Sequence, residues 1–311
     1  MHTNSPALRP IQNHIKGHLA LSGAAVIYGA NYLIAKSVMP DPIGPNSFIA
    51  LRVIGAALLF FLLAYRRLVI PAREHWGRFL LCAVCGVATN QLLFFNGLAL
   101  TSPINASIMM TSNPIMVLII SSILLKQKLT LTKITGVLIG AVGAIAIILM
   151  STYDTARTSH WLGDVFILIN SLSWALYLVM VKPLMKHYHP MVITAWVFLI
   201  GTILVFPFGG MGLSSLPWET FDTGQWFAIM YVIVCVTFLA YLFNMAGIHH
   251  LSPEVASAYI YFQPLLAGLF AFLFTWYSGK DYAGDITWLK MAAGLLVFLG
   301  VYLVSRKENG K

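Results

Sequence analysis

Ten apolar segments, each about twenty residues long, run through nearly the whole chain. They cover approximately residues 18–38, 45–65, 76–99, 104–125, 131–150, 161–182, 189–209, 225–248, 254–277 and 286–305. A bilayer core about 30 Å thick needs about 20 apolar residues in a single helix, so each segment is long enough to cross it. Each run is continuous rather than alternating with a period of two, which favours helices over barrel strands. The sequence therefore predicts an all-α membrane protein with ten transmembrane helices.

The composition excludes a water-soluble domain of this size. Of the 311 residues, 59% are hydrophobic and 9% are charged, whereas a soluble domain carries roughly 25% charged residues. The same apolar content excludes disorder. The formal net charge is +9, but the basic residues alternate between loops instead of forming one stripe, so we expect no nucleic-acid partner. We expect the lipid bilayer and a small-molecule substrate as partners.

Basic residues in the loops predict the orientation of the chain in the membrane. With a cytoplasmic N-terminus, the inner segments hold fourteen basic residues and the outer segments three. The inner residues are Arg9, Lys16, Arg66, Arg67, Arg73, Arg78, Lys126, Lys128, Lys133, Lys182, Lys186, Arg306, Lys307 and Lys311. The outer residues are Arg157, Lys280 and Lys290. Because positive residues collect on the cytoplasmic side, this bias predicts that both termini lie inside.

The two halves of the chain resemble each other. Residues 101–114 read TSPINASIMMTSNP, and residues 251–264 read LSPEVASAYIYFQP. At an offset of 150 residues, the identical pairs are Ser102 with Ser252, Pro103 with Pro253, Ala106 with Ala256, Ser107 with Ser257 and Pro114 with Pro264. Further upstream the offset becomes 146, which pairs Lys36 with Lys182. Spans one to five therefore repeat as spans six to ten.

Five spans in each half is an odd number, so the second half must enter the membrane from the opposite side. This predicts an inverted-topology repeat with a pseudo-two-fold axis in the membrane plane. The repeats are residues 18–150 and 161–305, between cytoplasmic tails at 1–17 and 306–311. Two such halves have two nearly equivalent ways to pack, one open to each side, as alternating access requires. The alternative is a duplication that is kept only for packing.

Short motifs occur in the same order as in a known family of carriers. The first span contains Tyr28-Gly29-Ala30-Asn31 and Lys36, and the second contains Ala50-Leu51-Arg52. Gly97-Leu98-Ala99-Leu100 runs into Thr101-Ser102-Pro103, and both halves carry a Ser-Pro…Ala-Ser…Pro segment. Over residues 18–305 the chain resembles the drug/metabolite transporter superfamily, in its ten-helix EamA-type branch.

The resemblance implies a carrier of small metabolites in the cytoplasmic (inner) membrane, often an exporter of amino acids or toxic organic compounds. It also implies that spans three, four, eight and nine lie near the cavity. Spans five and ten would then act mainly as packing or dimer helices.

Two basic residues, Lys36 and Arg52, lie inside predicted spans, where an ionisable group is unfavourable and indicates a functional site. Either can hold a carboxylate or phosphate through charge-assisted hydrogen bonds. The alternative is that both side chains snorkel to the outer interface. No Asp, Glu or His lies near the centre of a span. We therefore expect a neutral, zwitterionic or anionic substrate rather than a lipophilic cation, and a facilitated or weakly coupled mechanism.

Deep amide and aromatic side chains complete the predicted binding site. A pocket with few polar groups and aromatic walls suits a small amphipathic metabolite. The candidate substrate-binding residues are Tyr28, Asn31, Lys36, Arg52, Asn90, Gln91, Trp174, Tyr177, Tyr241, Asn244, Tyr259 and Gln263. For each amide the alternative is a hydrogen bond between helices, worth about 0.6 kcal/mol in a membrane. Pro114 and Pro264 each remove a backbone donor inside a span, which predicts kinks or hinges beside the cavity.

Three glycines, Gly136, Gly140 and Gly143, fall on one face of span five. Small residues let helices approach closely, so this face predicts packing within the chain or a homodimer seam. We expect no catalytic residue and no cofactor. We also expect no metal: Cys82 and Cys85 have the CxxC spacing of a metal site, but they lie on an apolar helix without a histidine cluster. The leading hypothesis is a secondary transporter that exports small organic metabolites by alternating access. The alternatives are an intramembrane enzyme acting on lipid and a non-transporting membrane sensor or scaffold.

Overall fold

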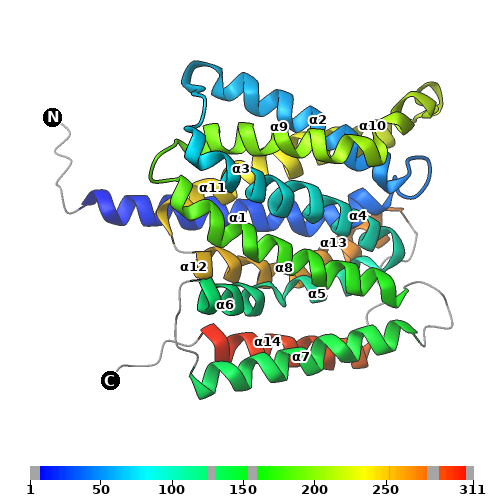
Figure 1. Ribbon diagram of the computed structural model, residues 1–311. Coiled ribbons are helices and arrows are strands. Elements are labelled where there is room, and N and C mark those ends of the chain that lie inside the picture. The colour runs from blue at the N-terminus through cyan, green and yellow to red at the C-terminus, as the bar shows by residue number, and fades with distance from the viewer. Residues whose placement is uncertain (1–7, 125–129, 153–159, 252, 279–286, 306–311) are drawn as a thin grey trace.

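The computed structural model describes residues 8–124, 130–152, 160–251, 253–278 and 287–305 (Figure 1). This part of the chain is α-helical, and among its residues nine helices are long and apolar enough to cross a membrane. The remaining predicted span, α14 (Trp288–Ser305), contains a shorter apolar stretch, Trp288–Gly300. The prediction of an all-α, multi-pass membrane protein with about ten helices is confirmed.

Most of the predicted spans are single helices. They are α1 (Leu8–Lys36), α2 (Pro45–Ala64), α7 (Leu131–Thr152), α8 (Trp161–Leu184), α9 (Pro190–Gly209) and α14. Proline begins both α2 and α9, because the N–H that it lacks would have no partner within the helix in any case. In Figure 1, α1 begins and α14 ends at the left-hand end of the bundle.

Spans three and eight each contain a π-helical segment at matching positions. Span three consists of α3 (Trp76–Ala83), the π-helix η3 (Val84–Ala88) and α4 (Thr89–Leu100). Span eight consists of α10 (Thr223–Met230), the π-helix η6 (Tyr231–Leu239) and α11 (Ala240–His250). A shift of 150 residues carries η3 onto positions inside η6. Such segments change which backbone carbonyls are available to side chains, and they occur frequently at functional sites.

Spans four and nine are interrupted immediately before the two predicted kink prolines. Span four divides into α5 (Pro103–Met110) and α6 (Asn113–Leu124). Span nine divides into α12 (Pro253–Ala258), the 3₁₀ turn η7 (Tyr259–Tyr261) and α13 (Phe262–Ser278). Proline disfavours helical geometry in the residue before it, and it removes a backbone donor. Each span is therefore interrupted by a turn with 3₁₀ hydrogen bonds, at the positions where the sequence predicts kinks or hinges. That these turns act as hinges stays a prediction.

Helices of the two halves pack in a repeating pattern. In one set of contacts α4 and α6 pack on α8, and in the other α11 and α13 pack on α1. The pairs α2 with α9 and α7 with α14 join corresponding spans of the two halves. Figure 1 shows α1 and α8 running in opposite directions. The packing of spans three and four on span six thus has a counterpart in the packing of spans eight and nine on span one.

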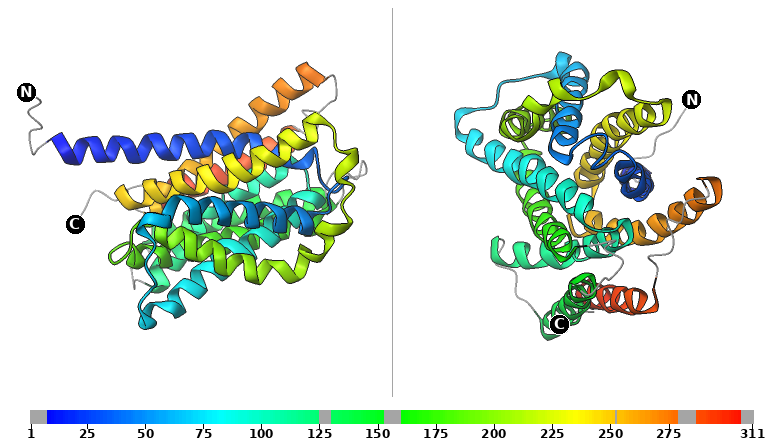
Figure 2. Two further views of the ribbon diagram at one scale, coloured as in Figure 1. Left: turned by 90° about the horizontal axis from the view of Figure 1, so that it is seen from above. Right: turned by 90° about the vertical axis from the view of Figure 1, so that its right-hand side faces the viewer.

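The α7–α14 pair lies at one edge of the bundle (Figures 1 and 2). A Cβ atom on Gly143 would lie 2.6 Å from the carbonyl oxygen of Ala293, and one on Gly300 would lie 2.5 Å from that of Gly136. Gly140 lies against both α14 and α6. The glycine face therefore packs against α14 and α6, as expected for packing within the chain. A homodimer through this face stays a prediction.

Candidate functional site

A cavity that encloses about 760 Å³, including its mouth, lies between the two halves of the bundle. Its wall combines α1, α2, α4 and α5 with α8, η6, α11, α12, η7 and the start of α13. A wall of aromatic and apolar side chains with a few polar groups is typical of a small-molecule site. All the sequence candidates except Lys36 and Tyr177 line it, namely Tyr28, Asn31, Arg52, Asn90, Gln91, Trp174, Tyr241, Asn244, Tyr259 and Gln263.

An aromatic wall forms one side of the cavity. The ring centroids of Trp174 and Tyr241 are 5.4 Å apart in a T-shaped arrangement. Behind them, the Tyr177 ring lies 5.0 Å from that of Trp174, and its hydroxyl donates to the sulfur of Met245 at 3.1 Å. Tyr177 is thus placed outside the cavity lining, where it supports the wall from α8.

A chain of hydrogen bonds leads from the cavity to the π-helix of span three. The Gln91 Nε2 atom donates to the hydroxyl of Tyr241 at 2.7 Å, and this hydroxyl donates to the carbonyl oxygen of Gly86 in η3 at 2.8 Å. Asn90, beside Gln91, donates from Nδ2 to the Oδ1 atom of Asn170 at 2.6 Å. The π-helix therefore supplies the acceptor that orients Tyr241, and Tyr241 in turn orients Gln91.

Arg52 reaches the cavity from α2 and is anchored on the π-helix of span eight. Its Nε atom donates to Oγ1 of Thr237 at 2.8 Å, and the Thr237 hydroxyl donates to the carbonyl oxygen of Val232 at 2.7 Å. The guanidinium lies over the ring of Phe95, a geometry typical of a cation–π contact. Arg52 is 2% exposed, and its Nη1 atom has no hydrogen-bond partner. Within the described part of the chain, no acidic side chain pairs with it.

The first helix is joined across the cavity to spans eight and nine. The Asn244 Nδ2 atom donates to the Tyr28 hydroxyl at 3.1 Å. The Tyr32 hydroxyl donates to Oε1 of Gln263 at 2.6 Å. Towards the end at which α1 begins, the Nδ1 atom of His18 lies 2.6 Å from the hydroxyl of Tyr259. The corresponding contacts of the other half are those of α8 with α4 and α6, so span one and span six both contribute to the cavity wall.

Lys36 is placed away from the cavity, at the C-terminal end of α4. Its ammonium donates to the carbonyl oxygen of Leu98 at 2.8 Å, to that of Ala99 at 3.2 Å and to that of Thr101. Lys182, its counterpart in the repeat, donates to the carbonyl oxygen of Leu251 at 2.9 Å and to that of Ile248 near the end of α11. The positive charge of each lysine meets the unpaired carbonyls and negative dipole of a helix terminus. The two lysines thus make the same contact at opposite ends of the bundle.

Sequence reasoning missed several lining residues. Asn170 carries the same signal as the other amides, a polar side chain inside an apolar span, and could have been included. Phe95 and Met110 also line the cavity, but an apolar residue within an apolar span carries no signal that separates a cavity from lipid. Among the residues that the structure describes, no group of three or more His, Cys, Asp or Glu residues could hold a metal ion.

Comparison with known proteins gives the family. The sequence model of the EamA-like transporter family matches residues 15–149 and 161–306. The chain belongs to the EamA-like transporter family. This places it in the drug/metabolite transporter superfamily and among transporters rather than enzymes. The two matched segments correspond to the two halves that the internal similarity relates.

Relatives with curated names share this assignment. The chain is 25% identical to the uncharacterized transporter YyaM of Bacillus subtilis, over 94% of each chain. It is 24% identical to an uncharacterized transporter of Archaeoglobus fulgidus, covering 94% of this chain and 99% of the other. It is 23% identical to a chloroplastic WAT1-related protein of Arabidopsis thaliana, over 91% of this chain and 67% of that protein. The protein is therefore a membrane transporter with a small-molecule substrate.

A solved crystal structure has the same fold. It superposes with a TM-score of 0.58 at 14% sequence identity, and the match covers 91% of this chain and 95% of the other. At this identity the likeness concerns the arrangement of the helices alone.

Proposed function

We propose that the protein is a secondary transporter that moves small organic metabolites across the cytoplasmic membrane by alternating access, in the direction of export. Its substrates are neutral, zwitterionic or anionic solutes such as amino acids. The observation that carries the proposal is the central cavity, whose wall is built from both halves of the chain. The export direction rests on the family resemblance alone.

The symmetry of the contacts supports an inverted repeat. Spans three and four pack on span six as spans eight and nine pack on span one, and α1 and α8 run in opposite directions (Figure 1). Two inverted halves have two equivalent ways of packing around one site. Exchange between these packings would expose the cavity first to one side of the membrane and then to the other.

The breaks before Pro114 and Pro264 give this exchange its flexible points. Each break lies in a span that lines the cavity, and residues on both sides of the second break face it. At the first break the Thr111 and Ser112 hydroxyls donate to carbonyls at the end of α5, so the interrupted backbone stays paired. Hinges are positions at which a few residues absorb a change in backbone angles.

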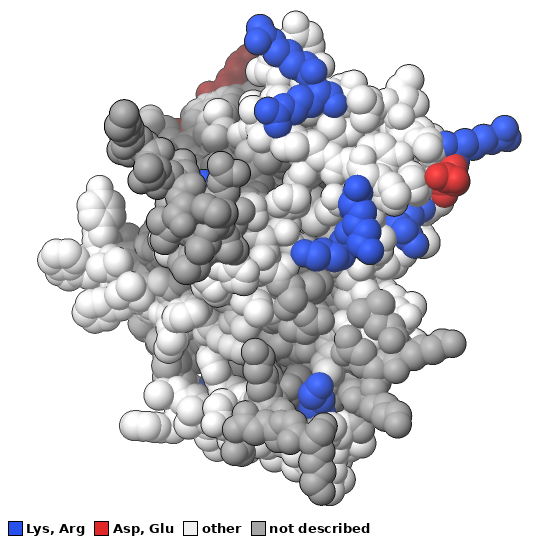
Figure 3. All heavy atoms as spheres, turned by 90° about the vertical axis from the view of Figure 1, so that its left-hand side faces the viewer, with Lys and Arg blue, Asp and Glu red and all other residues white. Residues whose placement is uncertain are grey.

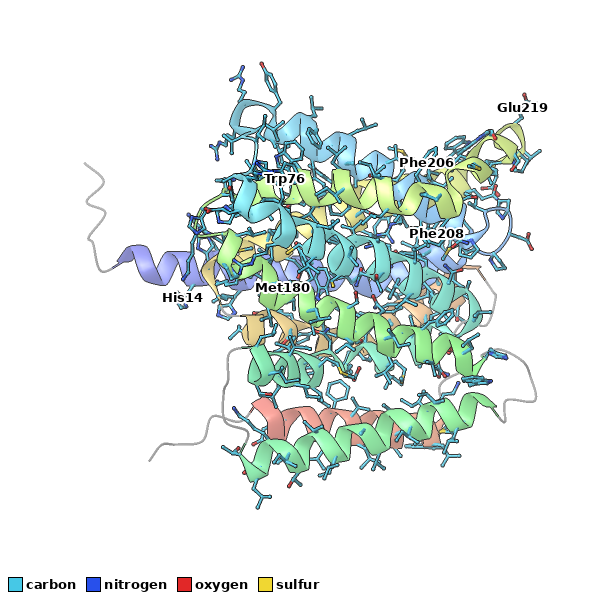
Figure 4. The ribbon with its side chains drawn as sticks, viewed as in Figure 1. His14, Trp76, Met180, Phe206, Phe208 and Glu219 are labelled. Atoms are coloured by element: carbon cyan, nitrogen blue, oxygen red, sulfur yellow. The ribbon has the colours of Figure 1, made fainter. Side chains whose placement is uncertain are left out.

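The charges at the two ends support a cytoplasmic position for the left-hand end of Figure 1. Figure 3 views this end and shows groups of Lys and Arg side chains on it. The exposed basic residues described there are Lys16, Arg66, Arg67, Arg73, Arg78 and Lys186. At the other end, Figure 4 places the acidic residue Glu219. Basic residues collect on the cytoplasmic side of bacterial-type membrane proteins, so both termini would lie inside.

Flux into proteoliposomes tests the proposal. Purified protein reconstituted into liposomes should give saturable flux of at least one amino acid or organic acid. The Trp174→Ala variant, which removes the aromatic wall, should lower that flux, while Leu62→Ala on the exposed face of α2 should not. Absence of saturable flux for every solute of these classes would contradict a transport function and favour a sensor or scaffold.

Cysteine accessibility tests alternating access separately. Ala24 and Ala256 line the cavity from α1 and α12. In a background without Cys82, Cys85 and Cys235, Ala24→Cys and Ala256→Cys should react with a membrane-impermeant thiol reagent from each side, with substrate changing the balance between the sides. Labelling from one side only, under every condition, would exclude the mechanism.

A further inference from the structure

We propose that the cavity selects an amphipathic organic acid, whose carboxylate binds Arg52 and whose amino or hydroxyl group binds Asn31 and Gln91. The inference rests on the proposed function and narrows its substrate class. It depends on three polar groups of the cavity wall that are buried and have an atom without a partner.

The first group is a positive charge that lacks a counter-charge. Arg52 is the only charged side chain among the described residues that line the cavity. It donates from Nε to Thr237, while its Nη1 atom is buried without a partner. An isolated buried cation is strongly unfavourable unless it is paired and its donors are satisfied. The ring of Phe95 offsets part of this cost. An anion bound in the cavity would offset the rest by pairing with the guanidinium.

The second and third groups are acceptors. The Oδ1 atom of Asn31 on α1 and the Oε1 atom of Gln91 on α4 are both buried without a partner. The orientation of the Gln91 amide is fixed by its neighbour, because the Tyr241 hydroxyl donates to Gly86 and must therefore accept from the Gln91 nitrogen. This leaves the Gln91 oxygen to accept a hydrogen from a ligand.

The remaining wall determines the body of the ligand. The Trp174 ring, the Phe94 ring and the Leu178 side chain line the cavity together with the polar groups. One acid group, one donor group and an apolar or aromatic body match this combination. An α-amino acid and an α-hydroxy acid with a large apolar side chain share the carboxylate, the apolar body and a donor group. The donor is an ammonium group in the first, which is zwitterionic, and a hydroxyl group in the second, which is an anion.

A ligand series on the purified full-length protein tests the inference by thermal unfolding. L-Phenylalanine or 3-phenyllactate should raise the unfolding temperature, because a ligand stabilises the folded state in proportion to its occupancy. The neutral amide 3-phenylpropanamide, which lacks the acid, should not. 3-Phenylpropanoate, which lacks the donor, should bind about tenfold or more weakly than 3-phenyllactate. The stronger of the first two ligands identifies the donor group.

Variants of the charged group give the second arm. Arg52→Met should weaken binding of the best acid by about ten- to hundredfold. It should also leave the ligand-free unfolding temperature unchanged or higher, because removal of an unpaired buried charge is stabilising. Arg66→Gln, which removes an exposed basic residue beside α2, is the matched control and should bind as the parent does. A ligand-free protein that unfolds much earlier in Arg52→Met, with binding of the acid retained, would show a structural role for Arg52 and overturn the inference.

The outcomes also separate this inference from the transport function. Equal stabilisation by acids and by the neutral amide would overturn the acid selectivity, while saturable flux of any metabolite would leave the transporter proposal standing. If chloride stabilises the protein equally and abolishes the effect of the acids, Arg52 holds an inorganic anion and the inference fails. Stabilisation by acids without flux of any solute would support the site and contradict transport.

Discussion

The guanidinium carbon of Arg52 lies 4.0 Å from the centroid of the Phe95 ring. The two side chains come from α2 and α4, and both are almost completely buried. Thr237 of η6 holds the same guanidinium from a third direction. Three spans from both halves of the chain therefore meet at one cation on the wall of the cavity.

A double-mutant cycle should measure this contact. Phe95→Leu removes the ring face, and Arg52→Met removes the charge. We expect the two changes to be coupled by about 1–2 kcal/mol, the range for a desolvated cation–π pair. Unfolding of the four proteins in mixed micelles gives the coupling free energy, and a value near zero would show that the ring acts only by packing.

The matched lysines should affect stability rather than substrate binding. Lys36→Met and Lys182→Met each remove donors from the carbonyls at a helix end. We expect each variant to lower the free energy of unfolding by about 1–3 kcal/mol. Because neither lysine lines the cavity, the affinity for the best ligand, measured by titration, should stay within a factor of about two. A large loss of affinity at unchanged stability in Lys36→Met would instead place Lys36 in the binding site.

The Tyr241 hydroxyl should matter more than the Tyr177 hydroxyl. Tyr241→Phe leaves both the Gln91 nitrogen and the Gly86 carbonyl without this partner, and we expect a loss of about 1–3 kcal/mol in unfolding free energy together with weaker ligand binding. Tyr177→Phe removes one weak bond to a sulfur atom and serves as the control with the same chemical change. Equal effects of the two variants would show that the hydrogen-bond chain has no special role.

Close packing of α7 on α14 should make Gly143 intolerant of a side chain. A Cβ atom there would lie 2.6 Å from a backbone oxygen, so Gly143→Leu should destabilise the protein by about 1–3 kcal/mol, as overpacking does. Gly268→Ala is the comparison, because a Cβ atom on Gly268 would meet nothing within 4 Å. A stable Gly143→Leu protein would mean that α7 and α14 do not pack closely.

His189 should make stability depend on pH below the ordinary histidine value. It lies between two spans, and partial burial, the Arg67 guanidinium 3.0 Å from its Nε2 atom and His249 lower its pKa. The folded protein therefore resists protonation of His189 more than the unfolded chain does. Its contribution to stability is complete above pH of about 6.5 and declines as the pH falls below that value.

Unfolding temperatures measured between about pH 5 and about pH 8 check this prediction. His189→Gln should flatten the decline below pH of about 6.5. His160→Gln is the control for the loss of a helix cap, because the His160 ring likewise accepts an amide hydrogen at the start of a helix. An unchanged acid slope in His189→Gln would contradict the prediction.

The sequence predicted the spans and most of the polar side chains of the cavity wall, because a polar side chain is conspicuous in an apolar helix and is unfavourable facing lipid. Arg52, Gln91 and Asn244 were found in this way, and the structure brings them to one cavity. Lys36 was equally conspicuous, but its partners are backbone carbonyls at the end of another span. Every residue has a backbone carbonyl, so the residue types do not show which carbonyls will accept from a lysine. The sequence therefore could not separate a ligand contact from a helix cap.

The π-helices were not predictable for a related reason. Residues 84–88 and 231–239 are almost uniformly apolar, and a segment without alternating polarity reveals no helical period. Phe95 was missed because nothing in an apolar run tells a ring that faces a cavity from one that faces lipid. The breaks before Pro114 and Pro264 were visible because proline acts on the backbone itself.

The π-helix of span eight has a geometric consequence for the Arg52 anchor. An α-helix advances by about 100° per residue, and a π turn accommodates one residue more than an α turn. If the wide turn moved along span eight, the side chains between its old and new positions would swing around the helix axis by about that angle while both ends stayed in place. Thr237 lies inside this stretch, so a displacement of the bulge would carry the Arg52 acceptor to another face of the helix without unfolding a single turn.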